Sequence, residues 1–174
     1  MHIKYTEATI EDADAIARLH AESWKLHYRG LCPDDYLDNK VDDNRQKVWS
    51  ERLASRDSKQ VVIVAKSTTD ELCGFACVYL RHHKVWGAYL DNLHVSSSQQ
   101  RKGIGQALMK EVAKNVHQDD SESKLYLHVL KENELAINFY QRIGGQHIAT
   151  YEKELPWGSR GEVCDYLWTL DQLL

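Results

Sequence analysis

Residues 96–112 read SSSQQRKGIGQALMKEV, and they place Gly103 and Gly105 between a polar link and an apolar-striped segment. A helix is predicted over residues 103–117, because apolar side chains recur there at the spacing of one helix face: Ile104, Leu108, Val112 and Val116. A glycine-rich turn that leads into a helix exposes backbone N–H groups, and such groups bind anions. The stretch therefore predicts an anion site at a helix N-terminus.

Strands are predicted on both sides of this helix, over residues 85–96 and 124–130. A strand–helix–strand unit has a right-handed crossover, so these two strands should run parallel. The other expected strands are 3–8, 60–67, 72–83, 146–155 and 162–170, and the other expected helices are 10–28, 43–55 and NELAINFYQRIGG (133–145). This order predicts a mixed-sheet α/β or α+β fold in a single domain, residues 1–174.

Charge and composition narrow the function. The net charge is 22 − 26 = −4 and no basic run exceeds residues 81–84, so we expect no nucleic-acid partner. The chain has no apolar run of about 18 residues and no signal-peptide pattern, which predicts a cytoplasmic protein without a membrane segment. The four cysteines lack CxxC spacing, so we expect reduced thiols and no metal site.

The glycine turn has several interpretations. It lacks the GxxxxGK[ST] spacing of a Walker A loop, and Leu108 stands where a GxGxxG/A dinucleotide motif needs its last small residue. A diphosphate held by successive backbone amides is the third alternative, with Gln100, Arg101 and Lys102 as extra donors. The turn could also do no more than start the helix.

Two segments in order favour the diphosphate. Gln100–Gly105 has the form Q/R-x-x-G-x-G/A after a strand that ends LHV, and NELAINFYQRIGG follows about thirty residues later. Over residues 88–147 this pattern resembles the GNAT superfamily of acyl-CoA-dependent N-acetyltransferases. The resemblance implies a mixed central sheet of about seven strands, flanked by about four helices and splayed between its fourth and fifth strands, here near 88–96 and 124–130.

The resemblance also implies acetyl-CoA as co-substrate. The pyrophosphate would be held by the backbone from Gln100 to Gln106, which comprises Gln100, Arg101, Lys102, Gly103, Ile104, Gly105 and Gln106. The pantetheine arm would lie in the splay and pair with the backbone of Leu93, His94 and Val95 in the manner of an added strand. Asn133 matches the asparagine of the family that hydrogen-bonds the cofactor, and the Val95 N–H would meet the oxyanion.

Three residues are candidates for the chemistry. Tyr140 matches the family's tyrosine in xxFY, which protonates the leaving thiolate. Many relatives carry a glutamate base where Tyr89 stands here, so Asp91 is the acidic side chain best placed to relay a proton, with Tyr89 beside it. In a strand without a bulge, strict alternation puts Tyr89, Asp91 and Leu93 on one face and His94 on the other.

The acceptor site would be walled by the loops at 27–38 and 155–161. Its candidate residues combine a carboxylate with aromatic surface, which suits a cationic amine, although a solvated acidic loop is the alternative: Trp24, Tyr28, Asp34, Tyr36 and Trp157. The expected function is acetyl transfer to a primary amine of a small molecule or peptide by direct attack in a ternary complex. A non-catalytic acyl-CoA-sensing domain and a nucleotide-binding protein stay open, as does a homodimer.

Overall fold

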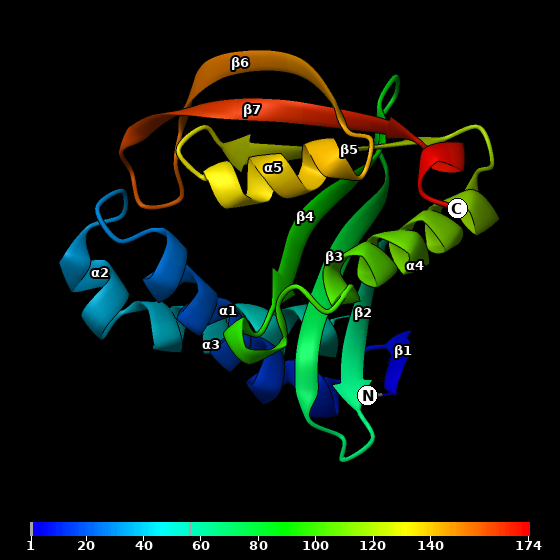
Figure 1. Ribbon diagram of the computed structural model, residues 1–174. Helices are drawn as coiled ribbons and strands as arrows, with labels where there is room; N and C mark the ends of the chain where they lie inside the picture. The colour runs from blue at the N-terminus through cyan, green and yellow to red at the C-terminus, as the bar shows by residue number, and fades with distance from the viewer. Residues whose placement is uncertain (1, 56) are drawn as a thin grey trace.

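The computed structural model describes residues 2–55 and 57–174, and a seven-stranded mixed sheet is its frame (Figure 1). The strand order is β1-β2-β3-β4-β5-β7-β6, and among the strands of the described residues only the β4–β5 pair is parallel. The strands are β1 Ile3–Glu7, β2 Gln60–Ser67, β3 Leu72–His83, β4 Gly87–Val95, β5 Lys124–Leu130, β6 Gln146–Glu154 and β7 Arg160–Thr169. The predicted mixed sheet of seven strands is confirmed.

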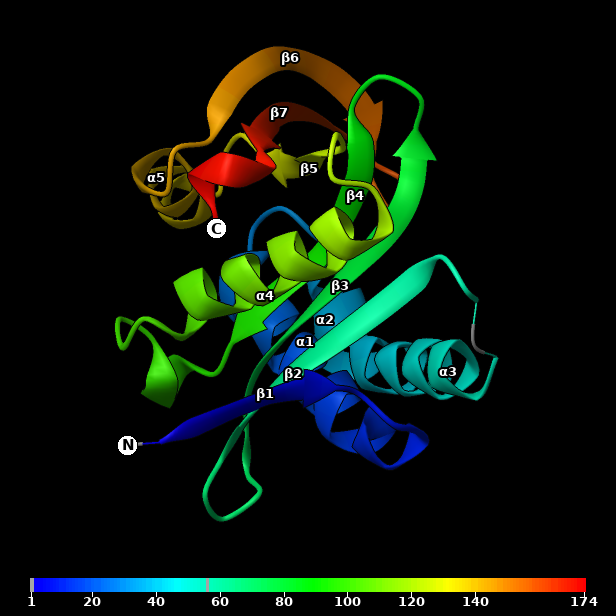
Figure 2. The same cartoon turned by 90° about the vertical axis from the view of Figure 1, so that its right-hand side faces the viewer.

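Helices cover both faces of the first half of the sheet. The α-helices are α1 Ala13–His27, α2 Asp34–Asn39, α3 Val41–Ala54, α4 Ile104–Asp119 and α5 Glu134–Arg142. Figure 2 shows α4 across one face of β2–β4, with α1 and α3 on the other. Short 3-10 turns lie at Ile10–Asp12, Ser97–Gln99 and Leu170–Gln172.

Strand β2 shows why the sheet takes helices on two sides. Its central residues are buried without alternation, so both faces need cover. Ile63 and Ala65 belong to the core under α4, whereas Val62 and Val64 belong to the core under α1 and α3. The apolar stripe of α4 that the sequence predicts is the side that enters the first of these cores.

The loop between the first two predicted helices contains a helix that the sequence analysis did not predict. Helix α2 occupies Asp34–Asn39, and α3 begins at Val41 rather than near residue 43. Pro33 is the N-cap of α2, and Asp34 and Asp35 lie in its first turn, where negative charge stabilises a helix. The structure thus has five α-helices in its described residues instead of about four.

Candidate active site

The two parallel strands separate after only two paired positions. Ala88 lies opposite Leu125 and Tyr89 opposite Tyr126, and no pairing with β4 extends further along the described part of β5. Strand β5 instead keeps its pairing with β7 along its whole length. A cleft of about 1390 Å³ opens at this point, lined by β4, β5, α1, α5 and the turn before α4. The predicted splay is therefore present.

The turn before α4 exposes a run of backbone amides. Gly103 is the N-cap and has a φ of 83°, a left-handed conformation that glycine adopts without steric cost. Within residues 2–55 and 57–174, no backbone amide from Arg101 to Gln106 has a hydrogen-bond acceptor, and the first that does is Ala107, which donates to Gly103 O at 3.0 Å. These N–H groups are available to an anion.

Gly105 has a different reason to be glycine. A Cβ at this position would lie 3.3 Å from the Phe139 ring and 3.7 Å from a Val95 methyl group. The glycine lets the start of α4 approach α5 and β4 closely. The amide run is therefore fixed between the two sides of the cleft.

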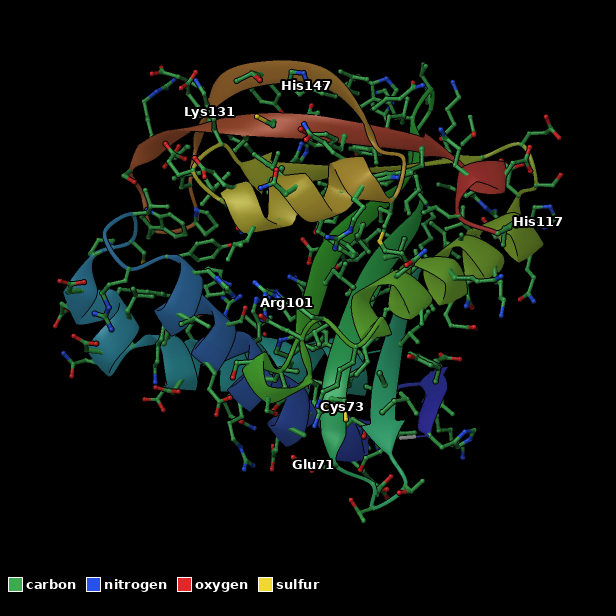
Figure 3. All side chains as sticks on the ribbon, in the orientation of Figure 1. Glu71, Cys73, Arg101, His117, Lys131 and His147 are labelled. Atoms are coloured by element: carbon green, nitrogen blue, oxygen red, sulfur yellow. The ribbon has the colours of Figure 1, made fainter. Side chains whose placement is uncertain are left out.

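The side chains of the turn divide into two groups. Arg101 lines the cleft and lies in the link between β4 and α4, below α5 in Figure 3. The Gln100 side chain donates to Val95 O at 3.3 Å, and Lys102 Nζ donates to Ser98 O at 2.9 Å. Lys102 is not among the residues that line the cleft, so its ammonium braces the turn. A cradle of free amides beside one guanidinium fits a diphosphate.

A β-bulge in β4 changes the predicted facing of its side chains. Cys77 of β3 lies opposite Asn92, and the next residue, Val78, lies opposite Leu90, so Asp91 is the extra residue. As a result, Leu93 does not share a face with Tyr89 whereas His94 does, which reverses the facing that we expected for both residues.

Directly opposed residues share a face of the sheet. Tyr89, Asn92 and His94 pair with β3 residues on the side of α1 and α3. Leu90, Leu93 and Val95 pair with residues on the side of α4.

Asp91 forms an ion pair with α3. Its Oδ2 lies 2.8 Å from Arg52 Nη1, and the same guanidinium donates to Asn92 Oδ1 at 3.1 Å. Both side chains of the pair are about a quarter exposed, at 26% and 23%. Tyr89 lines the cleft near this pair, and burial raises the pKa of its hydroxyl, with Asp91 as the next cause. The Arg52 contact fixes the Asp91 carboxylate on the α3 side.

Tyr140 and Asn133 lie on and beside α5. Asn133 is the N-cap of this helix, and its Oδ1 accepts a hydrogen bond from the Ala136 amide at 3.2 Å. Tyr140 is buried against Trp168, with ring centroids 5.8 Å apart, and it also lines the cleft. Burial raises the pKa of the Tyr140 hydroxyl, so the group stays protonated at neutral pH.

His94 lines the cleft but is tightly packed. Its Nδ1 lies 2.7 Å from Ser23 Oγ, and its ring centroid is 4.6 Å from that of His20. Burial lowers the pKa of His94 to about 3, with nearby His27 and Arg45 as further causes. The backbone of Leu93, His94 and Val95 borders the splay, where β5 no longer pairs with β4.

Three of the expected acceptor residues meet at one end of the cleft. The rings of Trp24, Tyr28 and Trp157 lie 5.4 to 5.7 Å from one another and line the cleft. Asp34 and Tyr36 are not among the lining residues. Asp34 instead pairs with Arg29 at 3.0 Å. The site therefore presents aromatic surface, without the Asp34 carboxylate.

A buried acid on the neighbouring strand β7 was not predicted from the sequence. Asp165 of β7 lies opposite His128 of β5, accepts a hydrogen bond from its Nδ1, and is 1% exposed. His128 lines the cleft. The two residues stand 37 positions apart, so only the strand register brings them together.

Two kinds of further site are absent from the described residues. No helix there is long and apolar enough to cross a membrane. No group of three or more histidine, cysteine or acidic side chains is arranged to hold a metal ion in residues 2–55 and 57–174. All four cysteines are buried and unpaired.

Comparisons with known proteins agree on one family. The model of the acetyltransferase (GNAT) family matches residues 15–145. A spermidine N(1)-acetyltransferase of Thermoplasma acidophilum is 24% identical over 147 residues, which cover 83% of this chain and 88% of that protein. YuaI of Bacillus subtilis, an uncharacterised N-acetyltransferase, is 28% identical over 145 residues, covering 82% of this chain and 80% of YuaI.

A solved structure has a similar fold. The PaiA N-acetyltransferase of Thermoplasma acidophilum, in complex with coenzyme A, superposes with a TM-score of 0.73 at 20% identity. The match covers 95% of this chain and 98% of that protein. The likeness therefore extends over almost the whole chain, including the splayed strands.

Proposed function

This chain belongs to the acetyltransferase (GNAT) family, and on that premise we propose that it transfers the acetyl group of acetyl-CoA to a primary amine of a small molecule or peptide. The amine attacks directly while both substrates are bound. The observation that carries the proposal is the run of free amides in the turn that lines the cleft between β4 and β5. Acetyl-CoA supplies an activated thioester, and this chain's residues supply the rest.

The turn before α4 would hold the diphosphate of the co-substrate. The backbone amides from Arg101 to Gln106 donate hydrogen bonds, and the Arg101 guanidinium adds charge. The free edge of β4 at Leu93, His94 and Val95 offers backbone groups to the amides of the pantetheine arm. Asn133 lines the same cleft at the head of α5.

Tyr140 would donate a proton to the thiolate that leaves. The acid must be protonated at working pH and must lie in the cleft, and Tyr140 meets both needs because burial raises its pKa. The backbone N–H of Val95 would stabilise the oxyanion. Asp91 and Tyr89 border the site on β4, but Arg52 holds the Asp91 carboxylate at 2.8 Å, which weakens Asp91 as a base.

The acceptor would enter at the aromatic end of the cleft. Trp24, Tyr28 and Trp157 present ring faces and edges there, and a cationic amine is attracted to aromatic faces. The Thermoplasma relative named for spermidine makes polyamines a sensible first class to screen. Tyr36 would support this wall through Trp24, whose ring centroid lies 6.2 Å away, whereas Asp34 takes no part because it pairs with Arg29.

The cellular compartment and the oligomeric state are proposed on other grounds. Four buried, unpaired cysteines favour a reducing compartment, and we place the protein in the cytoplasm. Strand β6 is an edge strand, paired only with β7 and largely exposed, so it offers a surface for a homodimer. Light scattering of the purified protein tests the homodimer.

The first test is calorimetric titration with acetyl-CoA, CoA, ATP and NAD in parallel. We expect selective binding of acetyl-CoA and CoA, and binding of ATP or NAD instead would overturn the assignment. Release of free thiol is then measured with a panel of primary amines. Release that depends on an amine supports transfer, whereas cofactor binding without any amine-dependent release would indicate a sensing domain.

A further inference from the structure

A histidine and an acid are joined across β5 and β7 beside the cleft. His128 and Asp165 lie directly opposite each other in the strand register, and His128 Nδ1 bonds to Asp165 Oδ1. Asp165 is 1% exposed, so its carboxylate is shielded from solvent. The Tyr151 hydroxyl of β6 donates to the same oxygen at 3.3 Å. One oxygen of the buried acid thus contacts both His128 and Tyr151.

This contact decides which nitrogen of His128 is free. An ionised carboxylate only accepts hydrogen bonds, so the Nδ1 atom carries the hydrogen and Nε2 keeps its lone pair. Both hydrogen bonds of this ring in the described residues, to Asp165 and to Tyr151, use Nδ1. In the described residues His128 Nε2 makes no hydrogen bond and is not among the buried unpaired atoms, and the residue lines the cleft, so Nε2 is the ring nitrogen left for a ligand.

The position of His128 in the splay suits an acceptor-side group. It lies two residues beyond Tyr126, the last β5 residue that pairs with β4. Its neighbour Leu127 packs in the same core as Tyr140, and alternation turns His128 to the opposite face of β5. The proposed acid and this imidazole therefore approach the splay from opposite sides.

Two candidate bases on β4 are less well suited than His128. Asp91 is ion-paired with Arg52 at 2.8 Å. His94 uses its Nδ1 with Ser23 and packs its ring against His20 and Phe75. The His128 ring is held by a carboxylate, whereas the His94 ring is held by a hydroxyl and burial lowers its pKa to about 3.

We infer that His128 Nε2 accepts the proton that the acceptor ammonium must lose, and that Asp165 is the residue that positions the ring. This inference rests on the proposed acetyl transfer. The arrangement of buried acid, oriented imidazole and open Nε2 is the one that general bases use in unrelated enzymes. Tyr89, whose ring centroid lies 5.2 Å from that of His128, completes the wall of the site.

The protons balance in this scheme. His128 takes one proton from R–NH₃⁺ and passes it to solvent, which leaves the R–NH₂ lone pair free to form the C–N bond. The C–S bond breaks, and the thiolate takes the Tyr140 proton. The nitrogen then loses its second proton, which restores the Tyr140 hydroxyl through solvent. The products are the N-acetyl amide, free CoA thiol and one released proton.

The first experiment compares His128→Ala with a matched control, His147→Ala. His147 lies on β6 (Figure 3), bonds to Thr150 and is not among the residues that line the cleft. We expect His128→Ala to lower kcat by about 10²-fold or more, to leave the calorimetric Kd for acetyl-CoA unchanged, and to regain turnover when free imidazole is added. Wild-type kcat in His128→Ala would overturn the inference.

The second experiment reads the positioning role without turnover. Nitrogen-detected NMR of imidazole-labelled protein should show His128 as the Nδ1–H form, with a proton strongly deshielded by Asp165. Asp165→Asn should abolish that signal and lower kcat with little change in KM. A wild-type His128 in the Nε2–H form would overturn the inference, and it would do so even if acetyl-CoA binding and amine acetylation are both established. Loss of acetyl-CoA binding by the wild-type chain would instead overturn the proposed function.

Discussion

At the scale of single residues, Tyr140 is the side chain whose role is easiest to isolate. Phenylalanine has the same ring and would keep the packing against Trp168. We predict that Tyr140→Phe lowers kcat by about 10²-fold because the leaving thiolate loses its proton donor. The affinity for acetyl-CoA should stay close to that of the wild type.

Steady-state thiol release and calorimetry measure these two quantities separately. The melting temperature is a third measurement, and it should change little because the ring stays buried. Unchanged kcat in Tyr140→Phe would remove Tyr140 as the acid. A large fall in affinity would mean that its hydroxyl mainly binds the co-substrate.

The sequence predicted a role for Tyr140 but not for His128, because the motif of Tyr140 is local whereas the partner of His128 is distant in the sequence. Tyr140 stands inside a short motif whose residues all lie on one helix. His128 acquires its role only through Asp165, which another strand brings beside it. The bulge at Asp91 was not predicted for a related reason, since one extra residue alters the facing of side chains without altering the apolar pattern.

At the scale of elements, the proposed diphosphate binding at the N-terminus of α4 can be tested by changing charge alone. A Cβ at Gly103 would meet nothing within 4 Å, so the fold has room for a side chain, although the φ of 83° costs about 1–2 kcal/mol. We predict that Gly103→Glu abolishes acetyl-CoA binding, because a carboxylate would compete for the free amides and repel the diphosphate.

Gly103→Gln is the matched control, with the same size and backbone strain but no charge. It should retain measurable binding in calorimetry, and both variants should unfold at similar denaturant concentrations. Equal losses of affinity in the two variants would indicate a steric effect. Wild-type affinity in Gly103→Glu would place the diphosphate elsewhere.

The closed end of the splay depends on Gly87. This glycine has a φ of 76°, and a Cβ there would clash with the backbone of Lys124, 2.7 Å from its N atom and closer to its carbonyl oxygen. We predict that Gly87→Ala destabilises the fold by about 3 kcal/mol, because β4 and β5 could no longer approach each other.

Gly158→Ala measures the cost of a positive φ without a steric clash. Gly158 also has a positive φ, 87°, but its Cβ would meet nothing within 4 Å, so the cost should be only about 1 kcal/mol. Urea denaturation of both variants measures the difference. Equal destabilisation would show that the close approach to Lys124 is not what Gly87 provides.

The elements themselves were largely predictable, with one informative exception. Long apolar strands and the stripe of α4 depend on local periodicity, and the structure has them where the sequence placed them. Helix α2 was missed because Pro33 and three nearby aspartates resemble a turn. Its stability comes from Leu37, which is buried among the residues around Trp24, and this packing is a tertiary effect.

At the scale of the whole molecule, His20 lies where four elements meet. Its ring on α1 packs against Trp49 of α3, Phe75 of β3 and His94 of β4, with centroid distances of 5.9, 5.7 and 4.6 Å. Trp49 Nε1 donates to His20 Nδ1 at 2.9 Å, so the other nitrogen carries the hydrogen, and it is buried without a partner. The core is thus built around a neutral imidazole.

This packing predicts how stability depends on pH. Burial lowers the pKa of His20 well below 6.5, and His94, Arg45 and Arg52 lower it further. Above the pKa of the unfolded state His20 is neutral in both states and adds no pH dependence to the free energy of unfolding. Below it only the unfolded chain takes up the proton, so the free energy of unfolding falls as the pH falls toward the folded pKa, by about 1.4 kcal/mol per pH unit.

Urea denaturation from about pH 8 down to about pH 5 measures the fall, and His20→Gln isolates the contribution of this residue. A glutamine oxygen can still accept from Trp49 Nε1 but takes up no proton. We therefore expect His20→Gln to be less stable than wild type at about pH 8. Below the pKa of the unfolded histidine, its free energy of unfolding should fall less steeply with pH, and the difference in slope should correspond to nearly one proton. Parallel pH profiles for the two proteins would show that His20 is protonated equally in the folded and unfolded states, and that the shared core tolerates a charge.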